Sequence, residues 1–129
     1  MIAKNNIFNI RASKTNWVGK TGARRGFVEF DTEEHGIRAW LVLMRTYRRR
    51  YGCTTIRQIV MRFAPPTENA TERYIQFVCG QTLLTPDTTL TCRLDYCFLA
   101  VAMARMETGT WIEATAVLEV MKKYDISII

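Results

Sequence analysis

Glu107 stands near the end of an apolar stretch, LAVAMARMETG, that runs from residue 99 to residue 109. If this stretch is a helix, its C-terminal end carries a partial negative charge, which favours a cation there and not a carboxylate. The helix dipole and apolar neighbours both raise the pKa of a carboxyl group, and a raised pKa suits a general acid for glycoside cleavage. The alternative is that Glu107 only occupies an exposed helix end. Glu-Thr-Gly alone is a weak motif and does not decide between the two.

A glycoside hydrolase needs a second carboxylate, at roughly 6.5–9.5 Å from the acid for inversion or roughly 5–5.5 Å for retention. The sequence offers two candidates. Glu29 alternates with Val28 in the strand-like segment GFVEF, so it faces either a cleft or water. Glu68 lies in the loop APPTEN, where it could instead cap the next helix. Three other carboxylates fit the start of a helix: Asp31, Glu33 and Glu34.

No other pattern indicates catalysis, a metal or a cofactor. The single histidine, His35, has no serine or cysteine partner in a recognisable arrangement, and the four cysteines form no C-x-x-C pair. Cys79 and Cys97 fall on apolar helical positions, so we expect reduced thiols in the core. The glycines of residues 19–26 lack the Lys-Ser/Thr of a phosphate loop. We therefore expect no cofactor, no metal site and no disulfide framework.

The net charge of +6 favours a polyanionic partner: nucleic acid, an acidic membrane or an anionic cell-wall polymer. The densest basic cluster is RTYRRRY, residues 45–51, in which Arg45, Arg48 and Arg49 share one face of a helix. This face could bind phosphates, and DNA retention would then be steeply salt-dependent. No base-reading motif accompanies it, so a solvated helix face is the favoured interpretation and nucleic acid the weaker partner.

Hydrophobic periodicity predicts how these residues are positioned. Residues 5–30 have β-like and loop character, with a strand over Gly26–Phe30. A helix follows from Asp31 to the C-cap Gly52. Four more helices are expected, over Thr55–Phe63, Thr71–Cys79, Cys92–Glu107 and from the capping box of Thr110 and Glu113 to Met121.

The pattern predicts one domain over residues 1–129, mainly α, of the α+β class, with a small N-terminal β/loop lobe. The predicted core residues are Ile37, Trp40, Leu41, Met44, Ile59, Phe98 and Val101. The longest apolar run, residues 97–104, is too short to span a membrane. The N-terminus shows no signal-peptide pattern, so we expect the protein to be cytoplasmic as synthesised.

Three segments, in order, resemble the lysozyme-like superfamily, above all lytic transglycosylases and bacterial glucosaminidases. NNIFNIR, residues 5–11, followed by Trp17-Val-Gly, resembles the Asn-Leu-Phe-Gly-Ile-Lys stretch of the glucosaminidases. GFVEFDTEEHGIRAW, residues 26–40, resembles their aromatic strand and following helix start. APPTENATERYIQFV, residues 64–78, resembles the transglycosylase turn that leads into a helix with a Tyr-Val/Ile pair. The chain is also similar to short phage virion proteins.

The resemblance implies a lysozyme-like fold and cleavage of peptidoglycan glycan strands, in which Tyr74 lies beside the catalytic acid. In that family the glutamate helix precedes the Asn-x-Phe segment, whereas here the glutamate helix comes last. A circular permutation, with Glu107 as the acid, accounts for this order, because domain termini often lie close together. The implied substrate-binding residues are Asn9, Arg11, Trp17, Glu29 and Glu68.

The implied activity is that of a muramidase or lytic transglycosylase of phage origin, without a cofactor. Such a protein would act in the virion or the cell envelope, with peptidoglycan glycan strands and other virion proteins as partners. The alternative is a non-enzymatic virion structural or cell-wall-binding module with the same fold. This alternative follows if the chain has lost its acid.

Overall fold

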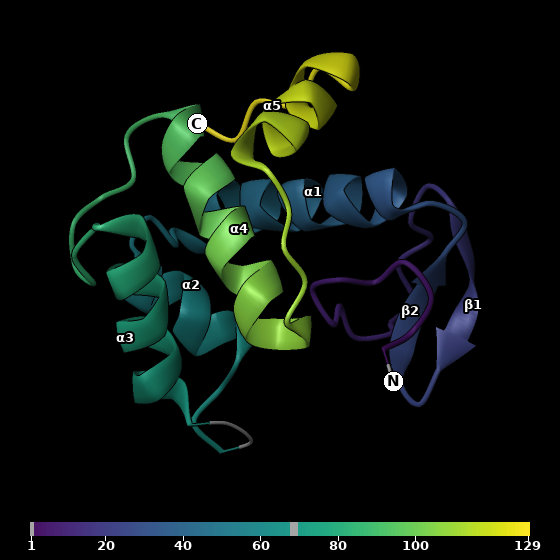
Figure 1. Cartoon of the computed structure of the whole chain (residues 1–129), viewed down its shortest axis with the longest axis horizontal. Helices are drawn as coiled ribbons and strands as arrows, with labels where there is room; N and C mark the ends of the chain where they lie inside the picture. The colour runs from purple at the N-terminus through teal and green to yellow at the C-terminus, as the bar shows by residue number, and fades with distance from the viewer. Residues whose placement is uncertain (1, 68–69) are drawn as a thin grey trace.

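Five helices pack together, and a small hairpin lies to one side of them. The computed structural model describes residues 2–67 and 70–129. Within them the elements are β1 (Lys20–Arg24), β2 (Phe27–Phe30), α1 (Glu33–Tyr51), α2 (Ile56–Phe63), α3 (Thr71–Thr82), α4 (Arg93–Thr108) and α5 (Ala114–Lys123). The predicted mainly helical architecture with a small N-terminal β/loop lobe is therefore confirmed (Figure 1).

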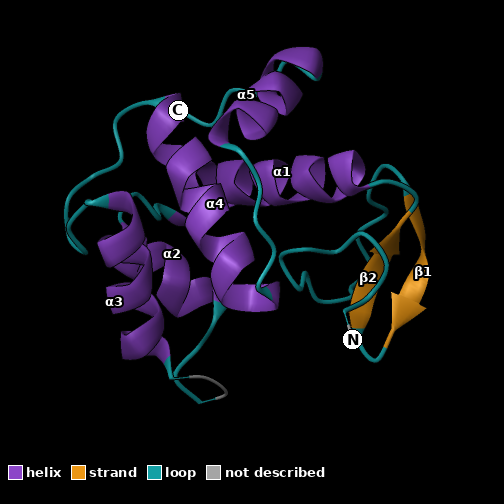
Figure 2. Ribbon diagram, viewed as in Figure 1, coloured by secondary structure: helices purple, strands orange, loops and turns teal. Residues whose placement is uncertain are grey.

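The hairpin of β1 and β2 is antiparallel, with Lys20 opposite Phe30 and Arg24 opposite Phe27. The two residues between the strands, Arg25 and Gly26, both have positive φ angles, of 52° and 85°. A two-residue turn of this kind matches the right-handed twist of paired strands. The predicted strand is confirmed, although Gly26 belongs to the turn. Figure 2 shows the two strands at the edge of the molecule farthest from α2 and α3.

Helix α1 begins one residue later than the sequence indicated. Thr32 is its N-cap, and the Thr32 hydroxyl accepts a hydrogen bond from the backbone N–H of His35 at 3.1 Å. Asp31 instead contacts Nδ1 of His35 at 2.6 Å. At the other end, Gly52 adopts a φ of 65° as the predicted C-cap. The helix places Trp40 in the centre of the core, where it stacks on Phe8 with ring centroids 5.1 Å apart.

The remaining helix ends follow the sequence with two exceptions. Thr55 and Gln58 form a capping box at the start of α2. Helix α3 continues beyond Cys79 to Thr82 and ends at Leu83, which has a φ of 61°. The capping box expected from Thr110 and Glu113 does not form. Glu113 is the N-cap of α5 without a side-chain hydrogen bond.

Helix α4 packs against both α3 and α5 and lies in front of α1 in Figure 1. Its buried side chains include Tyr96, Leu99, Ala100 and Met103. The prediction that Phe98 and Val101 point inward was wrong: Phe98 is 49% exposed and Val101 is only partly buried. Apolar residues occur all round this helix, so periodicity alone could not locate the face that is buried. The other predicted core residues are confirmed as buried: Ile37, Trp40, Leu41, Met44 and Ile59.

The described residues include no helix that is both long and apolar enough to cross a membrane. All four cysteines are free thiols, and Cys53 and Cys97 are buried.

Candidate functional site

The C-terminal end of α4 meets the N-terminal segment of the chain. Thr108, in the last turn of α4, donates a hydrogen bond from its hydroxyl to the carbonyl oxygen of Ile7 at 2.8 Å. The helix stops at Gly109, which has a φ of 71° and so accommodates the left-handed C-cap. Two segments about a hundred residues apart in sequence are thereby held side by side, with Glu107 at their junction.

The N-terminal segment is rigidly fixed by Asn6, which is completely buried. The Asn6 amide donates to the carbonyl oxygens of Ile10 at 2.9 Å and Val28 at 2.8 Å, and its oxygen accepts from the backbone N–H of Ile10 at 2.9 Å. One side chain thus satisfies polar groups of both the loop and β2, which would otherwise be costly to bury. This network holds the loop that carries Asn9.

Asn9 connects this loop directly to Glu107. The Asn9 amide nitrogen donates to the Glu107 backbone oxygen at 3.1 Å and to the Glu107 carboxylate oxygen Oε1 at 3.3 Å. Asn9 has a φ of 53°, a left-handed conformation that asparagine tolerates better than most residues. The left-handed backbone conformation at Asn9 and its short amide side chain together direct the amide group toward the Glu107 carboxylate.

Tyr74, from α3, approaches Glu107 from the other side. The Tyr74 side chain is buried, with 4% of the residue exposed. Its hydroxyl makes no hydrogen bond of ordinary geometry among the described residues. Burial, in the first place, and the neighbouring Glu107 carboxylate raise the pKa of Tyr74 well above its usual value. Tyr74 and Glu107 are thus electrostatic neighbours.

The surroundings of Glu107 raise the pKa of its carboxyl group. The largest cause is burial, which disfavours the charged form, and the side chain is half-buried. Tyr74, Asn9 and the charge of Arg11 lower this pKa, but not enough to cancel the effect of burial. The carboxyl group therefore keeps its proton to a higher pH than an exposed glutamate does. A raised pKa is the direction that a general acid requires.

A groove of about 340 Å³ has Asn9 in its lining, whereas Glu107 and Tyr74 are not among its lining residues. One wall comes from the N-terminal segment and includes Asn9, Arg11 and Trp17. The opposite wall comes from α1 and from the end of α2, and is formed by Leu43, Tyr47, Arg62, Phe63 and Pro65. Asn9 is thus shared by the carboxylate and the groove, and three of the sequence-predicted site residues lie together.

Two predicted substrate-binding residues are not part of this arrangement. Glu29 lies on β2 opposite Gly22 of β1, and it does not line the groove. Glu68 lies outside the described residues. No described carboxylate other than Glu107 is therefore placed at the site.

Two of the four arginines of residues 45–50 are engaged in internal contacts. Arg48 donates to the carbonyl oxygen of Leu90 at 2.9 Å and to the hydroxyl of Tyr96 at 3.1 Å. Arg49 donates to the carbonyl oxygen of Ser127 at 2.6 Å. The face that the sequence presented as a candidate phosphate-binding surface is therefore used in part to hold α1 against neighbouring loops.

Sequence reasoning missed the α1 and α2 wall of the groove. Tyr47 was assigned to the inner side of α1, and Arg62 and Phe63 belonged to a short helix whose ligand-facing side could not be identified. The sequence indicated this wall only through its composition, because arginines and aromatic residues lie close together in both RTYRRRY and MRF. Which of those arginines would share a wall depends on how α1 and α2 cross.

Comparison with known proteins gives one informative match. No protein-family model matches the chain. Over 86 residues the chain is 43% identical to Protein P5 of Pseudoalteromonas phage PM2. The chain is similar to a phage protein. The match covers 65% of this chain and 52% of Protein P5, so it spans about half the length of that relative.

Proposed function

We propose that this protein cleaves the glycan strands of peptidoglycan, with Glu107 as the general acid. The observation that carries the proposal is the position of Glu107: a half-buried carboxyl group of raised pKa, beside Tyr74 and bonded to Asn9, which lines a groove. A surface helix cap would have none of these surroundings. The permuted lysozyme-like arrangement implied by the sequence requires the end of the glutamate helix to lie next to the Asn-x-Phe segment. The bonds from α4 to Ile7 and Asn9 support that requirement.

In the proposed reaction, Glu107 transfers its proton to the oxygen of the glycosidic bond as the bond from the sugar carbon to this oxygen breaks. Asn9 orients the carboxyl group, and the Tyr74 hydroxyl adds a dipole beside it. As the bond breaks, positive charge develops on the sugar, and the Glu107 carboxylate left after proton transfer stabilises this charge. Arg11 and Trp17, on the groove wall, would contact the sugars.

The reaction can end in two ways, and the site favours one of them. A hydrolase uses a second carboxylate as base or nucleophile. A lytic transglycosylase instead closes a ring with a hydroxyl of the substrate and returns that proton to the acid. Glu29 does not reach the groove, so among the described residues only Glu107 offers a carboxylate. A single acid supports the transglycosylase reaction.

The similarity to Protein P5 supports the phage origin of the chain. Within this proposal the protein acts in the virion or the cell envelope, with glycan strands and other virion proteins as partners.

The test is the release of soluble glycan fragments from purified cell walls, followed by turbidity and mass spectrometry. Glu107→Gln keeps the shape of the side chain and removes the transferable proton, so we expect a loss on the order of a hundredfold or more. Glu119→Gln, on the exposed side of α5, makes the same chemical change away from the groove and should keep full activity. Equal activity of the two variants would rule out Glu107 as the acid. Fragments that end in an anhydro sugar would identify the transglycosylase reaction.

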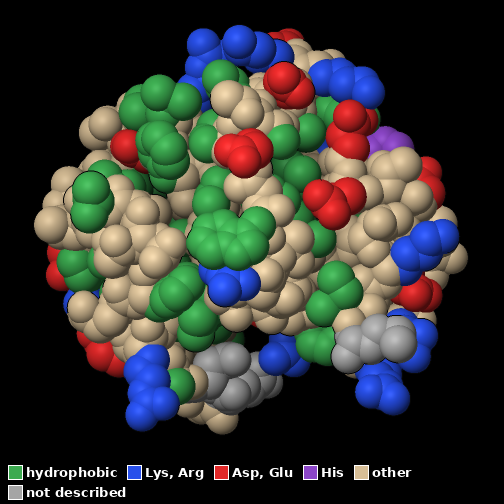
Figure 3. All heavy atoms as spheres, viewed as in Figure 1, with side chains coloured by type: hydrophobic (Ala, Val, Ile, Leu, Met, Phe, Trp, Pro, Cys, Tyr) green, Lys and Arg blue, Asp and Glu red, His purple; other side chains and the backbone are tan. Residues whose placement is uncertain are grey.

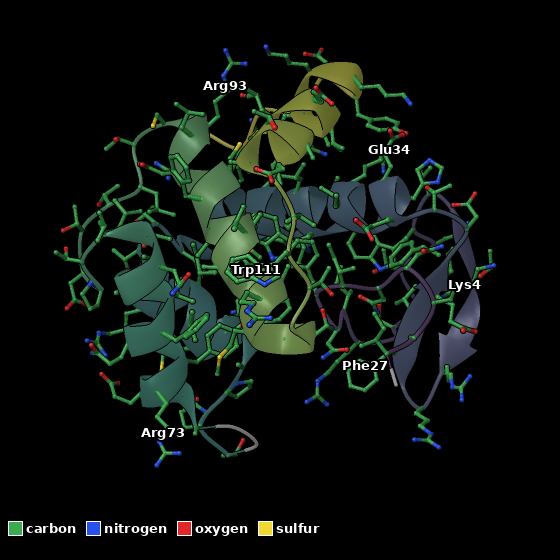
Figure 4. The ribbon with its side chains drawn as sticks, in the orientation of Figure 1. Lys4, Phe27, Glu34, Arg73, Arg93 and Trp111 are labelled. Carbon is green, nitrogen blue, oxygen red and sulfur yellow. The ribbon has the colours of Figure 1, made fainter. Side chains whose placement is uncertain are left out.

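A wall-binding or virion module without activity is the second candidate, and the outer face of α4 favours it. Leu94 and Phe98 are about half exposed, and Trp111 is 66% exposed beneath the guanidinium of Arg105. Figure 3 shows hydrophobic side chains spread over this face, and Figure 4 places Trp111 in front of α4. Exposed apolar clusters often mark interaction surfaces. Sedimentation of the protein with cell walls that it does not degrade would support this second candidate.

A further inference from the structure

Arg62 has an unusual position at the end of α2. Its guanidinium carbon lies 3.4 Å from the centroid of the Tyr51 ring and 5.6 Å from that of Tyr47. Both tyrosines belong to α1, and Tyr47 lines the groove together with Arg62. A guanidinium stacked on aromatic rings is held in place while its N–H groups remain able to bind. Arg62 is thus a cation fixed on the groove wall.

Among the residues that the structure describes, the groove lining provides no counter-charge for this cation. Arg62 takes part in none of the ion pairs between described residues, which are Asp31–His35, Arg57–Glu72, Arg57–Asp87 and Glu34–Lys123. The groove lining contains no aspartate or glutamate, and it includes a second arginine, Arg11. Burial raises the pKa of Tyr47 to about 12, so its phenol is neutral and adds no negative charge. The described lining of the groove therefore includes a cation, Arg62, with no described carboxylate in the lining beside it.

We propose that this groove is an anion-binding subsite, in which Arg62 binds a negatively charged group of the glycan polymer. The inference rests on the proposed function and specifies its substrate: a glycan that carries carboxylates or phosphates, and not a neutral one. The planar guanidinium pairs with either group through two parallel hydrogen bonds. The apolar residues that also line the groove, Leu43, Phe63 and Pro65, can contact the uncharged part of the substrate, and Arg62 itself is exposed and accessible to the anion.

Two chemical sources can supply the anion: the carboxylates of the peptides attached to peptidoglycan, or the phosphodiesters of a wall polymer. The experiment measures the affinity of the Glu107→Gln protein, in which no turnover occurs, by the change in tryptophan fluorescence. Three probes are compared: a disaccharide-peptide fragment of peptidoglycan, a glycerol-phosphate oligomer, and neutral chitotetraose. The same measurement is then made with Arg62→Gln added.

Arg62→Gln removes the charge at similar length, so we expect the affinity for an anionic probe to fall about tenfold or more. The affinity for chitotetraose should not change. A loss confined to the disaccharide-peptide identifies carboxylate as the bound group, and a loss confined to the glycerol-phosphate oligomer identifies phosphate. Arg62→Lys, which keeps the charge but not the planar fork, should give an intermediate value. Thermal unfolding of each variant shows that the fold is retained.

Arg73→Gln is the matched control, because Arg73 is exposed on α3 and points away from the body of the protein in Figure 4. It should bind all three probes like its parent. Equal losses for chitotetraose and the anionic probes, or no loss for either anionic probe, would overturn the subsite. Since binding is measured without cleavage, an inactive wild-type protein would contradict the proposed function alone. Normal cleavage with unchanged binding by Arg62→Gln would contradict the subsite alone.

Discussion

Two glutamates in this protein lie beside a tyrosine of another helix, and comparing them shows what makes one of them an acid. Glu34 lies in the first turn of α1, where Figure 4 shows it near α5. Its Oε2 accepts from the Tyr124 hydroxyl at 2.5 Å and from the Lys123 ammonium at 2.9 Å. Glu107 lies in the last turn of α4 with Tyr74 and Asn9. Each glutamate joins two distant parts of the chain.

The pKa values of the two carboxyl groups move in opposite directions. The pKa of Glu34 is lowered by the hydrogen bond from Tyr124 and then by Lys123. The pKa of Glu107 is raised, because burial outweighs what Tyr74 and Asn9 contribute. The helix dipole adds to both trends, since it favours a carboxylate at the start of a helix and disfavours one at the end. A tyrosine lowers the pKa of both glutamates, so the difference between them lies in burial, which dominates at Glu107 and is outweighed by Tyr124 and Lys123 at Glu34.

The largest expected effect is on activity, when each of the two tyrosines is replaced by phenylalanine. Tyr74→Phe should reduce glycan release on the order of a hundredfold, because it removes the dipole beside the acid. Its free energy of unfolding should stay the same or rise, since the lost hydroxyl is buried without a hydrogen bond. Tyr124→Phe should do the reverse, with normal activity and lower stability. Cell-wall assays and denaturant unfolding of both variants measure this. Comparable activity losses in both variants would contradict the distinction.

Glu107 accepts a hydrogen bond from the neutral amide of Asn9, whereas Glu34 accepts one from the charged ammonium group of Lys123. Asn9→Gly tolerates the φ of 53° and removes the amide, so the pKa of Glu107 should rise further. The alkaline limb of the pH–activity profile should then move to higher pH, and stability should fall by about 1 kcal/mol.

Asn5→Gly is the matched control for this variant. Asn5 also has a positive φ, of 58°, and donates to the carbonyl oxygen of Phe30 at 3.0 Å, away from Glu107. We expect a similar loss of stability without a change in the pH–activity profile. A shift of the alkaline limb in both variants would show that general loosening, and not the amide at Glu107, is responsible.

The two carboxyl groups should also give opposite pH dependences of stability. Glu107 has a raised pKa in the folded state, so its ionisation destabilises the fold as the pH rises from 4.5 through that raised value. Glu107→Gln should therefore gain stability over the wild type between pH 4 and neutral pH. Glu34 has a lowered pKa, so its contribution is complete above 4.5 and is lost as the pH falls through that lowered value. Glu34→Gln should be less stable than the wild type at neutral pH and equal to it in strong acid.

Denaturant unfolding of the two variants and the wild type over this pH range measures both trends. Parallel curves for Glu107→Gln and the wild type would show that Glu107 ionises normally in the folded protein.

The smallest expected effect concerns Lys123. Lys123→Gln breaks an exposed ion pair with Glu34, and such pairs are screened by salt. We expect a small decrease in melting temperature at low ionic strength that disappears in high salt, with unchanged glycan cleavage. A decrease that persists in high salt would show that the contact depends on packing and not on charge.

The local pattern of the sequence predicted much of the fold. Apolar spacing located the helices, and Gly52 and Gly109 marked helix ends that the structure confirms. The two capping boxes expected from the sequence, Asp31 with Glu34 and Thr110 with Glu113, do not form. The predicted start of α1 was wrong by one residue. Asp31 and Thr32 are both residue types that can cap a helix, so the sequence did not distinguish between them. Helix α4 was misjudged on Phe98 and Val101 because apolar residues surround it on all sides.

For the candidate site, the sequence by itself determined the types of group: a carboxylate ending an apolar helix, an amide and an arginine in NNIFNIR, and a tyrosine at the start of α3. The carboxylate follows from local chemistry, since helix ends and dipoles depend on neighbouring residues alone. The amide, the arginine and the tyrosine were implied by the resemblance to the lysozyme-like superfamily. Only the tertiary structure decided which of them meet. It brought Asn9 to Glu107, left Glu29 on the hairpin, and set Arg62 on Tyr51 across the groove from Arg11. The reason is physical: burial and the crossing of helices fix distances between residues far apart in sequence, and burial is the main cause of the raised pKa of Glu107.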